Sequence, residues 1–251
     1  MLSDSVVFTK RNIKHITRNL DQIFSAIVFP IILFIVLRYV FDGAIDTGNI
    51  TYVNFIVAGI LVEIIALGTN NTTTNLVVDL QRGVVNRFKS LPVFRSAFLI
   101  GFVAADLFRN LVSTLIIIGI AYIVGFHPIA GLLEWMLIIL LATLFSVAIS
   151  WISVIMGLFI KSVESSQIAF FVIFPLAFIS SAYVPPNTMP EPIMIFAENQ
   201  PFTQVINAIR ALMMGTAIND SGWLAVGWCI SIIIFAVPLA TWIFRQKTVQ
   251  K

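Results

Sequence analysis

Charge is scarce in this sequence. Only 11% of its 251 residues are Asp, Glu, Lys or Arg, whereas 59% are hydrophobic and the mean hydropathy is +1.00. A soluble globular domain carries about 25% charged residues, so the composition excludes that class. The sequence therefore predicts an integral membrane protein.

Cysteine and histidine are also rare. The single Cys229 lies inside an apolar run, so no intramolecular disulfide can form. The only histidines, His15 and His127, are expected at opposite membrane faces and cannot share a site within one chain. With no HExxH pair and no cysteine cluster of metal-binding spacing, no metal site is predicted.

The motifs of enzymatic catalysis are missing as well. No glycine is followed by lysine, so the chain has no GxxxxGK[ST] loop to hold the phosphates of a nucleotide. A GxSxG nucleophile elbow is absent too. The chain is therefore predicted not to be an enzyme, to have no catalytic residue and no cofactor of its own, and not to bind nucleic acid.

What the sequence does contain is long apolar runs. Because a hydrocarbon core about 30 Å thick needs roughly 20 helical residues, six segments are long enough to cross a membrane. These segments are 22–41, 51–73, 97–124, 132–160, 165–184 and 222–244. The predicted fold class is an all-α integral membrane protein with six transmembrane helices, in which 1–251 form one transmembrane domain.

The placement of basic residues predicts the orientation, because cytoplasmic loops carry an excess of Lys and Arg. With a cytoplasmic N-terminus, only Arg38 and Arg210 of the 15 Lys and Arg lie outside, and Arg109 lies in the membrane. The outer loops instead carry Asp42, Asp46, Glu191, Glu198 and Asp220. Both termini, including the tail 245–251, are therefore expected in the cytoplasm of a cell whose inner or plasma membrane holds the protein.

Two basic segments are expected on the cytoplasmic side. In 1–21 the pattern predicts an amphipathic helix in the lipid headgroup layer, although these residues could instead be only the positive flank of the first span. Its basic side chains are Lys10, Arg11, Lys14 and Arg18. The second segment, 77–96, is punctuated by Gly83 and Pro92, and a cytosolic partner would find little else to bind.

Polar residues inside the expected spans are candidates for a transport pathway. Glu63 lies near mid-depth, where an ionised group costs about 2.5–3.5 kcal/mol; it fits a substrate or proton path and hydrogen bonding between helices equally well. For Asp106 and Arg109 the i,i+3 spacing favours a pair within one helix. Asn70 and Asn71, in the run TNNTTTN, could line a vestibule, but carrying the helix out of the bilayer is favoured.

Between the last two spans, 185–221 is too apolar for a solvated loop yet cannot be one helix. Five of the ten prolines fall here: Pro185, Pro186, Pro190, Pro192 and Pro201. From Pro201 onward the pattern predicts a short amphipathic helix. We expect a broken re-entrant segment, which acts either as an outer gate or as a cap that only stabilises packing.

Three blocks of the sequence resemble the permease subunits of ABC-2 type exporters, and in particular the daunorubicin-resistance branch that exports antibiotics. The blocks are RNIKHITRNLDQIFSAIVFPIILFIVLRYVF, DLQRGVVNRFKSLPVFRSAFLIGFVAADLFRNL and FPLAFISSAYVPPNTMP…NQPFTQVINAIRALM. They cover nearly the whole chain and follow the order found in the family.

The resemblance implies a type V exporter-like permease that pairs with a second copy of itself, as a homodimer of twelve spans. It also implies that the energy comes from two copies of a cytosolic ATP-binding subunit, which bind ATP and Mg. A coupling helix for docking that subunit would lie at about 79–89, beside a connecting helix at about 8–20. The coupling residues implied are Asp79, Gln81, Arg82, Gly83, Asn86, Arg87 and Lys89. Gln81 departs from the acidic residue that often precedes Arg-Gly in the family.

The predicted function is export of an amphipathic, drug-like or lipid-like molecule across the membrane. Two alternatives remain. The protein could be a secondary transporter driven by an ion gradient, with Glu63 as the titrating group. It could also be a membrane scaffold that anchors a partner and moves nothing.

Overall fold

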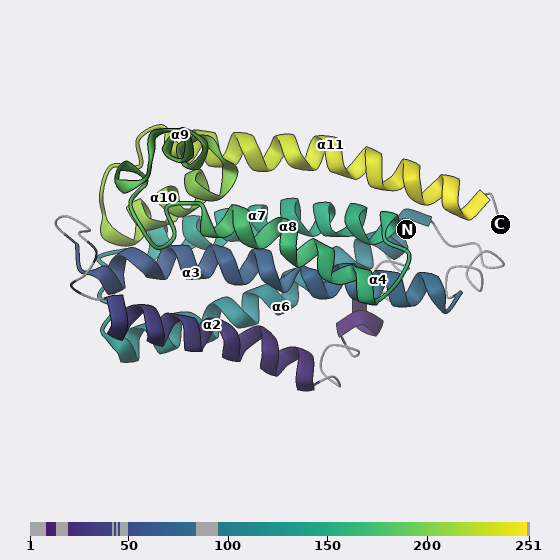
Figure 1. Cartoon of the computed structure of the whole chain (residues 1–251), viewed down its shortest axis with the longest axis horizontal. Helices are drawn as coiled ribbons and strands as arrows, with labels where there is room; N and C mark the ends of the chain where they lie inside the picture. Colours follow the sequence, from purple (N-terminus) through teal and green to yellow (C-terminus); the bar gives the residue numbers. More distant parts are fainter. Residues whose placement is uncertain are drawn as a thin grey trace.

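The computed structural model describes residues 9–13, 20–41, 43, 45, 50–83 and 95–249. These residues are helical with short connections and contain no strand (Figure 1). In chain order the elements are α2 (Leu20–Phe41), α3 (Tyr52–Gly68), α4 (Asn70–Gln81), α6 (Arg95–Val124), α7 (Leu132–Phe159), η1 (Glu164–Gln167), α8 (Ile168–Phe178), η2 (Pro186–Thr188), α9 (Glu191–Asn199), α10 (Pro201–Met214) and α11 (Ser221–Val249).

Four helical stretches are long and apolar enough to cross a membrane: Tyr52–Gln81, Ala97–Val124, Leu132–Phe159 and Ser221–Lys247. They correspond to four of the six predicted spans. The other two predicted spans are represented by α2 and by η1 with α8. Within the expected fifth span, helix α8 ends at Phe178 and turns follow it, which leaves this helix shorter than a full crossing.

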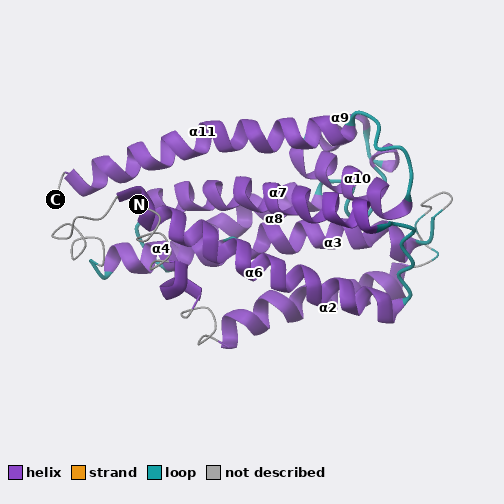
Figure 2. Ribbon diagram, turned by 180° about the vertical axis from the view of Figure 1, so that it is seen from behind, coloured by secondary structure: helices purple, strands orange, loops and turns teal. Residues whose placement is uncertain are grey.

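The long helices run side by side along the molecule (Figures 1 and 2). The short helices α9 and α10 lie at one end, and the last residues of α11 lie at the other (Figure 1). Helix α3 is buried in the middle, since 15 of its 17 residues are inaccessible and it contacts α2, α6, α7, α8 and α10. A helix that is hydrophobic on all sides belongs in such a central position.

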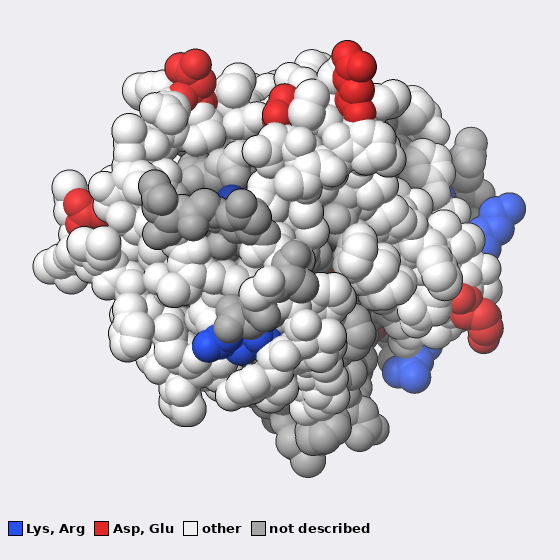
Figure 3. All heavy atoms as spheres, turned by 60° about the vertical axis from the view of Figure 1, so that its left-hand side comes forward, with Lys and Arg blue, Asp and Glu red and all other residues white. Residues whose placement is uncertain are grey.

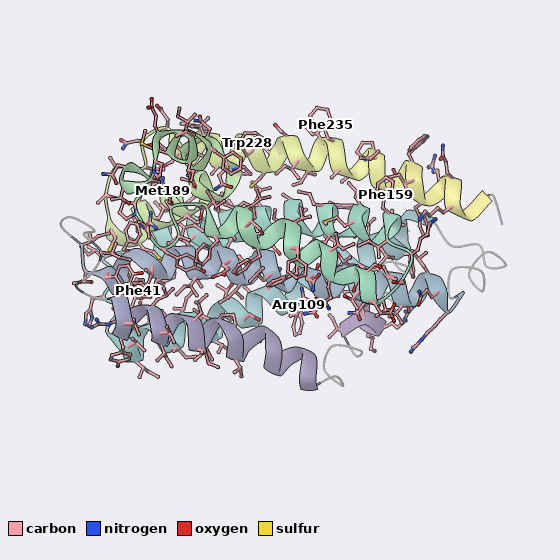
Figure 4. The ribbon with its side chains drawn as sticks, viewed as in Figure 1. Phe41, Arg109, Phe159, Met189, Trp228 and Phe235 are labelled. Carbon is pink, nitrogen blue, oxygen red and sulfur yellow. The ribbon has the colours of Figure 1, made fainter. Side chains whose placement is uncertain are left out.

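The outward faces of the peripheral helices are strongly apolar. On α11, Trp228 and Phe235 point away from the bundle (Figure 4), and Phe235 is 76% exposed. Exposed apolar side chains also cover the outer sides of α6 and α7. Exposed patches of this kind are unusual on a water-soluble monomer but match contact with lipid.

Helix α10 confirms the amphipathic helix predicted from Pro201 onward. Its apolar face, which includes Val205, Ile209 and Met213, is fully buried. Gly215 ends the helix with φ +63°, a conformation that glycine adopts without steric cost. The backbone N–H of Ile129 donates to the Met213 carbonyl at 2.9 Å, so the α6–α7 connection is held against this end of α10.

Candidate functional site

At the end of the molecule opposite α9 and α10, the helical turn 9–13 contacts α4. Arg11 forms an ion pair with Asp79 that is only partly exposed to solvent. Nearby, Gln81 Nε2 donates to the Lys161 carbonyl at 2.9 Å, which joins the end of α4 to the chain that follows α7. The structure thus brings together one residue from each of the two predicted basic segments.

The remaining residues of those two segments are only partly placed. Lys10 and Arg82 are exposed, and Gly83 has φ +65° just after α4 ends. Lys14, Arg18, Asn86, Arg87 and Lys89 lie outside the described residues. The docking role of these residues stays a prediction.

In the middle of the bundle, Glu63 of α3 accepts a hydrogen bond from the hydroxyl of Tyr183, which lies in the turn after α8. Both side chains are buried. The second carboxylate oxygen of Glu63, Oε1, has no hydrogen-bond partner in this arrangement. Glu63 therefore joins α3 to this turn through one carboxylate oxygen, while the other oxygen is buried without a hydrogen bond.

The same turn packs against α3 one helical turn away. A methyl group on Gly59 would lie 2.5 Å from both the Cα and the carbonyl oxygen of Ala182. Distances this short do not occur between real atoms that are not bonded, so only glycine permits the observed approach. The backbones of α3 and the turn are therefore in direct contact.

Arg210 of α10 holds the other side of this turn. It donates to the Ser181 carbonyl at 2.5 Å and to the Phe55 carbonyl of α3 at 3.0 Å, and its guanidinium lies 3.8 Å from the centroid of the Phe55 ring. It also donates to Asn207 at 2.8 Å, and Asn207 accepts from the Ser181 hydroxyl at 2.7 Å. One side chain thus connects three segments.

We call Phe55, Gly59, Glu63, Ser181, Ala182, Tyr183, Asn207 and Arg210 the outer junction. Only Glu63 among them was a predicted site residue. The sequence placed Arg210 in an outer loop, on the polar side of the predicted amphipathic helix. The polar residues that recur along α10, in QVINAIR, indicated that this helix has a polar face. The segment SSAY, which they contact, carries no sequence pattern that would have predicted the contact.

A second group of buried polar residues lies farther from α9 and α10, beside the boundary between α3 and α4. Asp106 and Arg109 form the expected ion pair within α6, and both are buried (Figure 4 labels Arg109 inside the bundle). Beside them, the Asn110 amide donates to Ser146 at 2.7 Å and the Ser153 hydroxyl donates to Thr69 at 2.7 Å. This group joins α6 and the α3–α4 boundary to α7.

The run TNNTTTN is helical, because α4 begins at Asn70 and only Thr69 separates it from α3. Whether it lines a vestibule or carries the helix out of the bilayer stays a prediction. Thr69, Thr72 and Thr73 are buried, and Thr73 donates to the Ser153 carbonyl of α7 at 3.0 Å. Asn70 and Asn71 are only partly buried.

The five prolines of the outer segment lie at helix boundaries. Pro185 precedes η2, which begins at Pro186, while Pro190 precedes α9, whose second residue is Pro192. Pro201 is the first residue of α10. Proline suits these positions because its missing N–H would have no helical partner there. The breaks between η2, α9 and α10 follow from this placement.

The surface at this end is mostly uncharged. Figure 3 shows a largely white face with separate acidic and basic side chains on it. Glu191, Glu198 and Asp220 are exposed among the short helices and the start of α11. Asp42 and Asp46 lie outside the described residues, and the placement of these acidic residues on the outer side stays a prediction.

Comparison with known proteins identifies the family. The chain matches the ABC-2 type transporter family over residues 5–214. It is 30% identical to the daunorubicin resistance ABC transporter permease protein DrrB1 of Streptomyces coeruleorubidus, over 90% of this chain and 80% of that protein.

Two further relatives agree. The chain is 29% identical to a probable doxorubicin resistance ABC transporter permease protein, DrrC, of Mycobacterium tuberculosis, over 98% of this chain and 90% of that protein. It is 25% identical to a putative transport permease, ycf38, of Cyanophora paradoxa, over 95% and 82% of the two chains. With its apolar bundle, this chain is a membrane protein that belongs to the ABC-2 type transporter family.

Proposed function

We propose that this protein is the permease subunit of an ABC exporter that moves an amphipathic, drug-like or lipid-like molecule out of the cell. The observation that carries the proposal is the family match over 5–214, together with relatives whose names describe drug-resistance permeases. ATP and Mg would be bound by two copies of a separate cytosolic subunit.

In this proposal α2 and the η1–α8 segment complete six membrane crossings, and 185–221 forms a re-entrant outer segment. A second copy of the chain supplies the other half of a homodimer, because six spans are few to enclose a path and a two-fold dimer is the simplest closed assembly. The last residues of α11 lie at the end opposite α9 and α10, which supports a cytoplasmic C-terminus (Figure 1).

The ATP-binding subunit would dock on α4 and the residues that follow it. The Arg11–Asp79 ion pair supports this assignment, since it links the N-terminal turn to α4 at the same end of the molecule. Movement of α4 would be transmitted directly to α3, because only Thr69 separates the two helices. Through α3 it would reach the outer junction.

The proposal is tested by purifying the tagged protein from its own cells in mild detergent and measuring ATPase activity in the eluate. A bound ATPase that is lost when Arg82, Arg87 and Lys89 are all changed to Glu supports a motor-driven permease. A matched control replaces the outer acidic residues Glu191 and Glu198 with Lys and leaves the ATPase bound. A protein that carries no ATPase in several detergents would contradict the proposal.

Glu63 supports one alternative, a transporter driven by an ion gradient, because its Oε1 is buried without a hydrogen-bond partner. That mechanism requires a titrating carboxyl group. It therefore demands that Glu63→Gln abolish transport and that transport continue without ATP.

A further inference from the structure

A cavity of about 360 Å³ lies between α6 and α7, with α3 behind it. This volume falls within the range of roughly 300–1,000 Å³ found for small-molecule sites. Its rim includes Phe108, Leu115 and Ile139, which are 43–57% exposed, so the cavity opens through the lipid-facing surface of the bundle. It is separate from the outer junction.

The cavity runs along α6. Tyr122 and Trp135 line one end, near the α6–α7 connection, and Leu107 lies at the other. Fifteen helical residues separate Leu107 from Tyr122, a rise of roughly 20 Å. Tyr and Trp are enriched where a bilayer meets water. A molecule in the cavity would therefore extend from the outer interface toward mid-depth.

The deep wall of the cavity is mostly apolar but carries a few polar side chains. Asn110, Thr114 and Ser146 line it although each is at least 93% buried, and the more exposed Thr143 adds a hydroxyl. Burying polar groups against hydrocarbon alone is unfavourable. Asn110 already donates to Ser146, but the hydroxyl groups of Ser146 and Thr114 can each take part in a further hydrogen bond. A plain acyl chain would offer these hydroxyl groups only methylene groups, whereas a ligand with a hydroxyl or carbonyl group could form hydrogen bonds with them.

The walls also determine the charge of the ligand. None of the described residues that line the cavity is Asp, Glu, Lys, Arg or His. A charged molecule would find no counter-ion in a medium where unpaired charge is costly. We infer that this cavity binds an uncharged amphipathic small molecule from the bilayer, with its apolar body against α6 and α7 and a hydroxyl or carbonyl group beside Asn110, Thr114 and Ser146.

Only the identification of the bound molecule as exported cargo rests on the proposed function; the binding itself does not. The test uses the full chain in lipid nanodiscs, without ATP or an ATPase. The probe is a naphthol that carries one hydroxyl and a photoreactive diazirine. A phospholipid with the diazirine in its acyl chain is the comparison, and labelled peptides are identified by mass spectrometry.

We expect the naphthol probe to label 107–122 and 135–146, and excess unmodified naphthol to suppress this labelling. Ala142→Phe, which fills the cavity, should reduce labelling at least about tenfold. Thr114→Val, which exchanges a hydroxyl for a methyl group at constant volume, should reduce it about threefold to tenfold. Gly119→Phe is the control, because nothing lies within 4 Å of a Cβ at that exposed position on α6.

Labelling that is spread evenly over all lipid-facing helices would overturn the inference. So would stronger labelling by the phospholipid probe with no effect of Thr114→Val, which would make the cavity a contact for ordinary lipid. If Ala142→Phe does not fold, Thr114→Val and the naphthol competition still decide. If no ATPase partner is found by purification, the proposed function is contradicted, but the labelling result still decides whether the cavity binds the probe.

Discussion

The hydroxyl of Tyr183 donates a hydrogen bond to Oε2 of Glu63, although 120 residues separate them in the chain. This contact joins the central helix α3 to the turn after α8. Together with Gly59 and Arg210 it makes the outer junction one connected structure. Movement of α3 cannot leave the outer segment undisturbed.

Removing the Tyr183 hydroxyl should destabilise the protein. In Tyr183→Phe the Glu63 carboxyl group is left buried without its donor, at a cost of about 1–3 kcal/mol. Glu63→Gln keeps a carbonyl oxygen that can accept the bond, so its thermal unfolding in detergent should stay near that of the wild type. Equal stability of Tyr183→Phe and wild type would show that the hydrogen bond contributes nothing.

Glu63→Gln also separates the two transport mechanisms. Because the proposed exporter takes its energy from ATP, we expect ATP-dependent efflux from proteoliposomes to stay within about threefold of wild type, a change of roughly 0.7 kcal/mol. Abolished efflux in a variant that folds normally would favour the ion-gradient mechanism.

The close approach of Gly59 to Ala182 predicts that Gly59→Ala lowers the stability of the folded protein. The added methyl group would lie 2.5 Å from backbone atoms of Ala182, and overpacking of this kind costs about 1–3 kcal/mol. Gly119→Ala is the matched control, since nothing lies within 4 Å of its Cβ. The measurement is the unfolding temperature of both variants; identical temperatures would contradict the packing described.

The Asp106–Arg109 pair predicts that replacing both residues destabilises the protein less than replacing Arg109 alone. Arg109→Leu leaves Asp106 buried without its cation and should cost about 3–5 kcal/mol. The double variant Asp106→Asn with Arg109→Leu removes the stranded charge and should recover much of this loss. Yield of monodisperse protein and unfolding temperature measure both effects. A double variant that is as unstable as Arg109→Leu would exclude charge burial as the cause.

Arg210 predicts a local change rather than a global one. Lysine cannot reproduce a planar guanidinium that donates to several acceptors at once, so Arg210→Lys should loosen the turn 179–184 from α3 and α10. Hydrogen exchange in that turn should become about tenfold faster, which corresponds to about 1.4 kcal/mol. Exchange in α4, which lies away from α10 (Figure 1), is the internal control, and unchanged exchange in the turn would contradict the role of Arg210.

The Arg11–Asp79 ion pair predicts a coupling effect that exceeds its effect on stability. Because Arg11 is partly exposed, the pair should contribute only about 0.2–1 kcal/mol to stability. In the proposed exporter, Arg11→Asp should nonetheless lower the substrate-stimulated ATPase rate of the reconstituted complex. The swap of Arg11→Asp with Asp79→Arg should restore it, and a swap no better than either single variant would show that the contact is not used.

The sequence by itself determined the class of the protein and the positions of its long helices. Hydrophobic length and the sign of loop charges act locally and add along the chain, so 97–124, 132–160 and 222–244 could be predicted closely. The helix from Pro201 and the Asp106–Arg109 pair were also predictable, because each depends on spacing within one helix.

Only the tertiary structure decided which segments meet. Glu63 could be recognised as a costly buried acid, but its partner Tyr183 lies in a turn that the sequence had assigned to a continuous fifth span. Arg210 was counted as an outer-loop cation because nothing local shows that α10 folds back against Phe55 and Ser181. Contacts between residues this distant in the chain depend on how the helices pack, and a single sequence carries no periodic signal for that packing.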